Sequence, residues 1–150
     1  MSLVEFNQVR LEINGRVLVD RFDFSMSKGE HVGIIGPSGA GKTTFLNLFL
    51  GLVQPTSGHV KVFGKDLRDL HQPALEKMRM RMGMLFQTNA LFSEWTVYEN
   101  IAFPIRYHYH LDEKVIETMV KIKLDSVGLR GAETYMPQQL SGGMARRVAL

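Results

Sequence analysis

The 150-residue chain contains no cysteine, which excludes a disulfide framework and thiolate metal sites. No apolar run approaches the roughly 18 to 20 residues of a membrane span, and the first residues, MSLVEFNQVR, bring charged and polar groups too early for a signal peptide. Neither sign of charge dominates: 18 basic and 15 acidic side chains give a formal charge of +3. This excess is too small to indicate a nucleic-acid or lipid surface. We therefore expect a globular protein without a nucleic-acid partner, and we expect any membrane role to work through another protein.

The N-terminal third of the chain predicts an α/β unit. The turn dipeptide Asn14-Gly15 divides two apolar alternations, 4–13 and 17–24, which predict an antiparallel hairpin with one buried face. The segment HVGIIG, 31–36, is apolar at consecutive positions, as is typical of a strand buried on both faces. A glycine-rich loop and the apolar helix pattern TTFLNLFLGL follow it. Strand, glycine loop and helix together open an α/β unit.

The remaining segments predict further strands and helices. HVKVF, 59–63, alternates as a half-exposed strand, 73–82 is helix-like, and 82–86 is expected to be a short buried strand. Asp112 is expected to cap a helix that ends near Gly128, with one apolar face made of Val115, Ile116, Met119, Val120 and Ile122.

The stretch GPSGAGKT fits the phosphate-loop pattern G-x-x-x-x-G-K-[ST] and lies between a predicted strand and a predicted helix, as the pattern requires. Its glycines allow backbone N–H groups to converge on a β-phosphate, and the helix N-terminus adds positive potential. Lys42 would carry its charge to the β- and γ-phosphates, and the Thr43 hydroxyl would ligate Mg²⁺. The alternative is a glycine-rich turn that binds nothing. The predicted phosphate-binding residues are Gly36, Pro37, Ser38, Gly39, Ala40, Gly41, Lys42, Thr43 and Thr44.

A second possible anion site lies in QLSGGM, two residues after Pro137. Ser141 is expected to cap the helix that follows, while Gly142 and Gly143 expose its first amides to an approaching phosphate. Taken alone, the same residues could be an ordinary helix start.

The phosphate loop, the glutamine that closes GMLFQ and the motif LSGGM resemble, in order and spacing, the nucleotide-binding domain of ABC transporters. The resemblance runs over essentially the whole chain. It implies an α/β P-loop NTPase fold, with an N-terminal antiparallel β subdomain and the start of the phosphate-loop core over about 1–87. It also implies an α-helical subdomain over about 88–140 and the start of the signature helix over 140–150.

The resemblance also implies roles for individual residues. Gln87 would reach Mg²⁺ and the attacking water, and would sense the membrane partner. The signature motif, Ser141, Gly142, Gly143 and Met144, would bind ATP held by the opposite subunit. ATP and Mg²⁺ are then the expected cofactors, and a second copy of the subunit is an expected partner in a two-fold dimer.

A narrower resemblance concerns MRMRMGMLFQTNALFSEWTVYENIAFPIR and LSGGMARR, which look like the ATPase of Mla-type, MCE-associated phospholipid transporters. Met144 stands where the signature usually has glutamine. The resemblance implies a permease subunit, an MCE-type lipid-binding protein and a peripheral place on the cytoplasmic face of the inner membrane. Amino-acid importers match these stretches less well. A soluble ABC protein of DNA repair or translation also fits less well, because the chain has no long coiled coil and little basic excess.

The sequence departs from the family pattern in two respects. Ile13, with Leu11 nearby, stands where the family stacks an aromatic ring on adenine, so we expect weaker base binding. The family's Walker B aspartate, catalytic glutamate and switch histidine are not found among these residues. We therefore expect a C-terminally incomplete nucleotide-binding domain in which hydrolysis is lost or slow and 31–36 has an unpaired edge. The alternative is a product that binds nucleotide only.

Four further features have simpler interpretations. His108 and His110 alternate in RYHYH, as on a strand, and suggest a metal, but a solvent-facing segment explains them better. In KMRMRMGM, 77–84, we expect the methionines to pack and the arginines to be solvated. Trp95 is either a packed anchor or part of a permease-docking surface. Arg146 and Arg147 are expected to be a surface pair that supports the signature helix.

Overall fold

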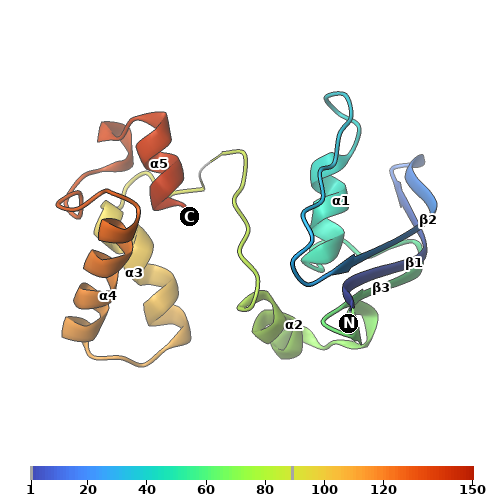
Figure 1. The fold of residues 1–150 in the computed structure, drawn as a ribbon, viewed down its shortest axis with the longest axis horizontal. Coiled ribbons are helices and arrows are strands. Elements are labelled where there is room, and N and C mark those ends of the chain that lie inside the picture. Colours follow the sequence, from blue (N-terminus) through green and yellow to red (C-terminus); the bar gives the residue numbers. More distant parts are fainter. Residues whose placement is uncertain (1, 89) are drawn as a thin grey trace. The chain divides into compact units, whose positions relative to one another are not determined.

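A computed structural model describes residues 2–88 and 90–150 of the chain (Figure 1). It contains two compact units, Met1–Met82 and Gly83–Leu150, which we call unit 1 and unit 2. Each unit has its own cluster of buried apolar side chains. Within the described part of the chain, none of the helices combines the length and the apolar character needed to span a membrane.

Unit 1 is built on an antiparallel sheet. Its strands are β1 (Ser2–Ile13), β2 (Arg16–Ser27), β3 (Ser57–Val62) and β4 (Lys65–Asp66), in the order β2-β1-β3-β4. Asn14 and Gly15 both adopt positive φ, 52° and 76°, as a tight turn between paired strands requires. The predicted hairpin and the predicted strand at 59–63 are therefore confirmed.

An irregularity in the hairpin changes which side chains are buried. Gln8 and Arg21 have positive φ, 47° and 44°, and the β1–β2 register shifts between Phe6 and Val9. The Gln8 N–H donates to the Asp23 carboxylate (2.7 Å), so the bulged backbone is not left without a partner. The predicted single buried face holds in β1 from Val4 to Leu11, but it fails at Ile13, which is 37% exposed, and along β2, where Val17 is 41% exposed.

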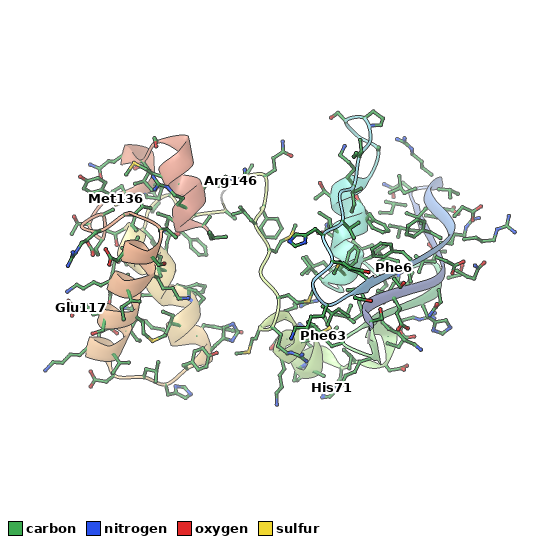
Figure 2. All side chains as sticks on the ribbon, viewed as in Figure 1. Phe6, Phe63, His71, Glu117, Met136 and Arg146 are labelled. Carbon is green, nitrogen blue, oxygen red and sulfur yellow. The ribbon has the colours of Figure 1, made fainter. Side chains whose placement is uncertain are left out.

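Two helices and a short 3-10 segment complete unit 1: α1 (Lys42–Phe49), η1 (Leu67–Asp69) and α2 (Gln72–Arg79). Both helices were predicted. Phe6 of β1, labelled in Figure 2, is 1% exposed. Its ring packs against the rings of Phe45 and Phe49 of α1, with centroids 5.1 Å and 4.8 Å apart. The Arg79 side chain donates to the carbonyl oxygens of Leu50 (2.7 Å) and Gly51 (3.0 Å). These contacts hold α1, and with it the end of the glycine loop, on the sheet.

Two predicted strands are absent from the described residues. The segment 31–36 has no sheet partner there, and its Val32 and Ile35 are 50% and 97% exposed. The segment 82–86 likewise forms no strand. A strand persists only where a neighbour accepts its backbone hydrogen bonds. The residues described here supply no such neighbour to either segment, so both predictions are wrong for this structure.

Unit 2 is helical and consists of α3 (Val97–His108), α4 (Glu113–Ser126), η2 (Pro137–Gln139) and α5 (Gly142–Val148). The Asp112 carboxylate caps α4 by accepting the Lys114 N–H (2.8 Å), which confirms the predicted start. The buried face of α4 is Ile116, Val120 and Leu124. Val115 (46% exposed) and Ile122 (63% exposed) face solvent, so their placement on the buried face was wrong.

Candidate functional site

The loop 36–41 has the local geometry of an anion cradle. Gly39 and Gly41 have φ of 76° and 86°, a left-handed conformation that side-chain-bearing residues rarely adopt, and a backbone bond runs from the Ala40 N–H to the Pro37 carbonyl (3.3 Å). The Lys42 ammonium donates to the carbonyl oxygens of Gly36 (2.9 Å) and Pro37 (2.7 Å). The loop thus curls around the lysine. The ammonium group is bonded to two backbone carbonyl oxygens, and the oxygens of a phosphate could take their place as its acceptors.

The first turn of α1 suits a negatively charged ligand. Gly41 is the N-cap, it provides no side-chain cap, and the first turn contains no acidic residue. The Thr43 side chain is exposed, whereas Thr44 is half-buried. A helix N-terminus without a cap presents unpaired N–H groups and the positive end of the helix dipole. The residues present therefore fit a phosphate group, with the Thr43 hydroxyl accessible to a bound Mg²⁺.

The hairpin places an apolar side chain against this loop. A Cβ at Gly41 would lie 3.8 Å from Leu18 of β2. The sequence pattern did not mark Leu18, because the irregular β1–β2 register decides which β2 side chain faces the loop. Ile13 is 37% exposed at the end of β1, but Leu11 is 1% exposed and belongs to the core. Leu11 therefore takes part in the packing of unit 1, and the contact of Ile13 with a base stays a prediction.

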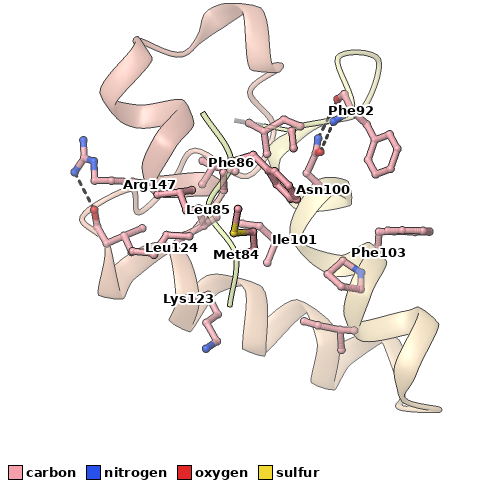
Figure 3. A pocket seen from close by; sticks show the side chains of 18 of the residues that line it. Met84, Leu85, Phe86, Phe92, Asn100, Ile101, Phe103, Lys123, Leu124 and Arg147 are labelled. Carbon is pink, nitrogen blue, oxygen red and sulfur yellow. Dashed lines mark hydrogen bonds between the residues drawn. The ribbon is translucent and has the colours of Figure 1, made fainter. Parts of the chain in front are cut away.

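In unit 2, Gln87 is exposed and follows a segment that lines a pocket of about 600 Å³. Figure 3 shows this segment, with Met84, Leu85 and Phe86 lying over side chains of α3 and α4. The lining is mainly apolar, and Gln87 is not part of it. The pocket therefore offers no group of acids and bases for catalysis.

The LSGGM motif begins α5 as the sequence predicts. The Ser141 hydroxyl oxygen accepts the Met144 N–H (3.3 Å), which makes Ser141 the N-cap. Gly142 and Gly143 are exposed, and a Cβ on either would meet nothing within 4 Å. The fold itself therefore does not demand glycine at these positions. The Met144 side chain, in contrast, packs against the buried cluster of unit 2.

The two arginines after this motif differ. The Arg147 guanidinium donates to the Val127 carbonyl at the end of α4 (2.8 Å; Figure 3). Arg146 is exposed, and no comparable hydrogen bond of its side chain is found in the described residues. Of these two arginines, only Arg147 is therefore hydrogen-bonded to the end of α4 within the described residues, in addition to the apolar packing of α5 on the buried cluster of unit 2.

Four aromatic side chains from α3 and from the loop before it form a partly exposed group that we call the aromatic surface: Phe92, Trp95, Phe103 and Tyr107. The Phe92 and Trp95 ring centroids are 4.4 Å apart, and those of Trp95 and Phe103 are 5.2 Å apart. Trp95 is half-buried by this packing, whereas Tyr107 is 67% exposed. The loop that carries Phe92 and Trp95 also receives a hydrogen bond from the Gln138 amide to the Ser93 carbonyl (3.2 Å). Gln138 lies just before the LSGGM motif, so the aromatic surface and the motif are joined within unit 2.

Other titratable groups lie outside these sites. Asp66 accepts from the Arg68 N–H (3.0 Å) and lies 2.6 Å from His59 Nδ1. Burial acts to raise the pKa of Asp66, but these hydrogen bonds outweigh it and lower the pKa below its ordinary value. His108 ends α3 and is therefore not on a strand. Within residues 2–88 and 90–150, no cluster of three or more histidine, aspartate or glutamate side chains could hold a metal ion.

The alternating methionines and arginines of 77–84 divide differently from the prediction. Met78 is buried, whereas Met80 is 46% exposed. The Arg81 guanidinium lies 3.9 Å from the centre of the Phe63 ring, and the Arg79 side chain donates to the Leu50 carbonyl at the end of α1. The arginines of this run therefore support the packing of unit 1 and are not simply solvated.

The ABC transporter family model matches residues 19–150. The chain belongs to the ABC transporter family. Its fold is that of the family's nucleotide-binding domain, with an antiparallel β part and a helical part. Among solved structures, the ATP-binding cassette MJ0796, in a dimeric post-hydrolysis state bound to ADP and Pi, matches 97% of this chain and 66% of its own, with a TM-score of 0.82 and 29% identity. CbiO1 from Clostridium perfringens, part of the ABC transporter complex cbiONQ, matches 99% of this chain and 59% of its own, with a TM-score of 0.83 and 26% identity.

Similar sequences include transport ATP-binding proteins of known systems. The chain is 46% identical over 149 residues to the intermembrane phospholipid transport system ATP-binding protein MlaF of Haemophilus influenzae, covering 99% of this chain and 56% of the relative. Its identity to MlaF of Escherichia coli K12 is 40%, covering 99% and 55%. For the methionine import ATP-binding protein MetN 2 of Bacillus cereus the identity is 42%, covering 88% and 39%. The chain thus spans about half the length, or less, of these relatives.

Proposed function

We propose that this chain is the nucleotide-binding part of an ATP-binding subunit that energises phospholipid transport by an ABC transporter. The geometry of the loop 36–43 carries the proposal: two left-handed glycines, an α1 without a side-chain cap and the Lys42 ammonium on the loop carbonyls. The similarity to phospholipid-transport ATP-binding proteins extends over 99% of the chain. Over the family as a whole, ATP with Mg²⁺ is the ordinary ligand.

In the nucleotide-bound state, the residues of the loop would have separate tasks. The N–H groups from Gly39 to Thr44 would hold the β-phosphate, and Lys42 would leave its two carbonyls to pair with the β- and γ-phosphates. Thr43 and Gln87 would be the side-chain ligands of Mg²⁺, which would neutralise charge on the phosphates. Ile13 would lie against the adenine, with Leu18 packing beside Gly41.

The exposed LSGGM motif supports a site completed by a second copy of the subunit. Ser141, Gly142 and Gly143 would meet the γ-phosphate of ATP held by that copy, because no side chain of their own fold occupies the space around the two glycines. Met144 would contribute through its backbone, since its side chain is used in packing. A solved neighbour, MJ0796, is described as a dimer, which agrees with a two-fold arrangement.

For the permease subunit, we assign the aromatic surface as the docking site of a short helix. Phe92 and Phe103 are 49% and 40% exposed, and Phe92 follows Gln87 closely in the chain. Exposed aromatic groups packed on one another are typical of contact sites for apolar side chains. We further propose that the assembly includes an MCE-type lipid-binding protein and lies at the cytoplasmic face of the inner membrane. Within this chain, the proposed boundaries between its subdomains lie near residues 87 and 140. ATP hydrolysis is proposed for the whole protein.

An amino-acid importer is the second candidate, because MetN 2 shares 42% identity over 132 residues. The coverage favours phospholipid transport, since the MlaF proteins match 149 residues. The signature ending in Met144 and the run ALFSEWTVYEN favour it as well. A product that binds nucleotide without hydrolysing it remains the alternative for this chain by itself.

The nucleotide site is tested by the variant Lys42→Ala with Lys65→Ala as its control. Both remove one positive charge from unit 1, but Lys65 lies in β4, outside the loop. Loss of a charge-assisted hydrogen bond of about 1.5–3 kcal/mol would lower affinity for ATP·Mg²⁺ by at least about tenfold in Lys42→Ala. Calorimetric titration of the 150-residue chain measures it, and Lys65→Ala should bind as the parent does. Equal affinities for Lys42→Ala and the parent would overturn the assignment.

The signature site needs a different assay, because it acts on a second copy. Ser141→Arg places a long cation where the proposed γ-phosphate approaches, but it leaves the loop 36–43 intact. We expect this variant to bind ATP·Mg²⁺ as the parent does and to lose ATP-dependent dimerisation, measured by sedimentation velocity. A variant that dimerises normally would contradict the role given to LSGGM.

A further inference from the structure

The side chain of Asn100, near the start of α3, makes several hydrogen bonds to the backbone of the residues that precede the helix. Its Oδ1 accepts the Phe92 N–H (2.7 Å), and its Nδ2 lies within hydrogen-bond distance of the carbonyl oxygens of Phe92 (3.1 Å), Trp95 (3.1 Å) and Thr96 (3.0 Å). Figure 3 shows the bonds to Phe92. Since an amide NH₂ group has two hydrogens, three carbonyls share two donors. Asn100 is thus the common partner of the loop Phe92–Thr96.

These bonds are not needed to begin the helix. Thr96 already caps α3, because its hydroxyl oxygen accepts the Glu99 N–H (3.2 Å) while the Glu99 carboxylate accepts the Thr96 N–H (2.7 Å). The first amides of α3, at Val97 and Tyr98, donate to the carbonyls of Tyr135 (2.8 Å) and Glu133 (2.9 Å). The Asn100 side chain is therefore not needed to cap the helix, and its bonds to Phe92 and Trp95 hold the loop that precedes α3.

The loop held by Asn100 is also the loop that carries half of the aromatic surface. The Trp95 N–H donates to the Phe92 carbonyl (3.2 Å), so the chain turns back between these residues and brings their rings together. Phe103, three residues after Asn100 in α3, lies on the same side of the helix. Its ring packs against the Trp95 ring, with the centroids 5.2 Å apart. Asn100 thus fixes the backbone beneath the rings, and Phe103 supports the rings themselves.

We propose that Asn100 is a positioning residue that shapes the aromatic surface for its partner helix. The identity of that partner rests on the proposed function, whereas the role of Asn100 in the loop does not. Aspartate at this position has the same size, but it would place a carboxylate among three carbonyl oxygens with no hydrogen to share. Asn100→Asp therefore removes the positioning without changing the volume of the side chain.

Trp95 is the only tryptophan in the chain, so its fluorescence reports directly on this loop. The test compares Asn100→Asp, Asn100→Ala, Thr96→Ala and Asn7→Asp in the 150-residue chain. Emission maximum and acrylamide quenching measure the exposure of Trp95, while far-UV circular dichroism and the urea midpoint measure the fold. Asn7 is exposed in β1, so Asn7→Asp makes the same change of charge away from the loop.

In both Asn100 variants we expect a red-shifted emission and stronger quenching with an unchanged helix content. Thr96→Ala should lower the urea midpoint with little change in emission, because the cap is lost and the loop bonds remain. Acidification of Asn100→Asp should return the emission toward that of the parent, since a protonated carboxyl regains one donor. Emission unchanged in both Asn100 variants would overturn the proposal. An equal shift in Thr96→Ala would also overturn it, because the change would then follow stability alone.

A measurement on the unaltered protein covers the case in which the Asn100 variants do not fold. The Asn100 side-chain NH₂ and the Phe92 amide should exchange with solvent at least about tenfold more slowly than free groups. Exchange at the free rate would overturn the proposal. ATP·Mg²⁺ affinity separates the two claims: Lys42→Ala tests the proposed function and leaves Trp95 emission unchanged, whereas Asn100→Asp changes the emission and leaves nucleotide affinity unchanged.

Discussion

Gly58 of β3 is expected to be the least replaceable glycine of unit 1. It lies opposite the Gln8 bulge of β1 with a φ of 82°. A Cβ built on it would overlap the Gln8 carbonyl oxygen, lying 2.5 Å from the Gln8 carbonyl carbon and 2.7 Å from the Asn7 carbonyl oxygen. All of these atoms are backbone, so no side-chain rotation relieves the overlap. Only a local separation of β1 and β3 makes room.

The cost of Gly58→Ala follows from these contacts. A left-handed conformation costs about 1–2 kcal/mol for a residue with a side chain, and separation of the strands removes at least two backbone hydrogen bonds of about 1 kcal/mol each. The sum is at least about 3 kcal/mol, which is a large part of the roughly 5–15 kcal/mol that stabilises a domain. Gly64→Ala is the matched control, because its φ is 77° and a Cβ there would meet nothing within 4 Å.

Urea unfolding followed by circular dichroism tests this reasoning. At a slope of about 1–3 kcal/mol per molar urea, Gly58→Ala should lower the midpoint by at least about 1 M, and by clearly more than Gly64→Ala does. The slopes should stay equal, since the unfolded chains are nearly identical. Equal losses in the two variants would refute the claim that overlap with the β1 backbone, and not φ alone, requires glycine at 58.

Three other predictions follow from the site and its surroundings. Because its folded-state pKa is lowered, Asp66 contributes stability that is present above its ordinary pKa of 3.8 and is lost as the pH falls through the folded value. The unfolding midpoint of the parent should therefore approach that of Asp66→Asn on acidification. A difference between the two midpoints that does not change with pH would contradict the lowered pKa of Asp66. Arg147→Gln should destabilise unit 2 by about 0.5–1.5 kcal/mol, since the Val127 carbonyl loses a charged donor, while Arg146→Gln changes the thermal midpoint little. Ile13→Tyr should raise ATP affinity by about two- to tenfold through ring stacking, and calorimetry that shows no gain would place the base elsewhere.

The elements that could be predicted from the sequence are those that local chemistry decides. Asn14-Gly15 fixes a hairpin turn because both residues tolerate positive φ. Asp112 and Ser141 start helices because their side chains accept N–H groups within three residues of their own position. The phosphate-loop pattern is equally local, since its glycines and lysine are contiguous.

The features that escaped prediction depend on distant parts of the chain. Whether 31–36 becomes a strand depends on a neighbour that accepts its hydrogen bonds, and no periodicity in the segment supplies that information. The bulge at Gln8 shifts which β2 residues face inward, and so decides that Leu18 lies beside Gly41. The bonds of Asn100 depend on how the preceding loop turns, although the residue is an unremarkable polar position in its helix pattern.

Three of the locally unfavourable choices of this chain fall at residues to which we have proposed contacts outside it. Glycine at 142 and 143 costs up to about 1 kcal/mol each relative to alanine in a helix, and the chain's own packing gives no reason for either. The first turn of α1 lacks a cap and an acid, and the aromatic surface leaves Phe92 and Phe103 nearly half exposed. A phosphate at α1, a nucleotide at α5 and an apolar helix on the aromatic surface would each offset one of these costs. Because natural sequences keep locally unfavourable choices mainly where function needs them, these three costs favour the three binding sites that we propose.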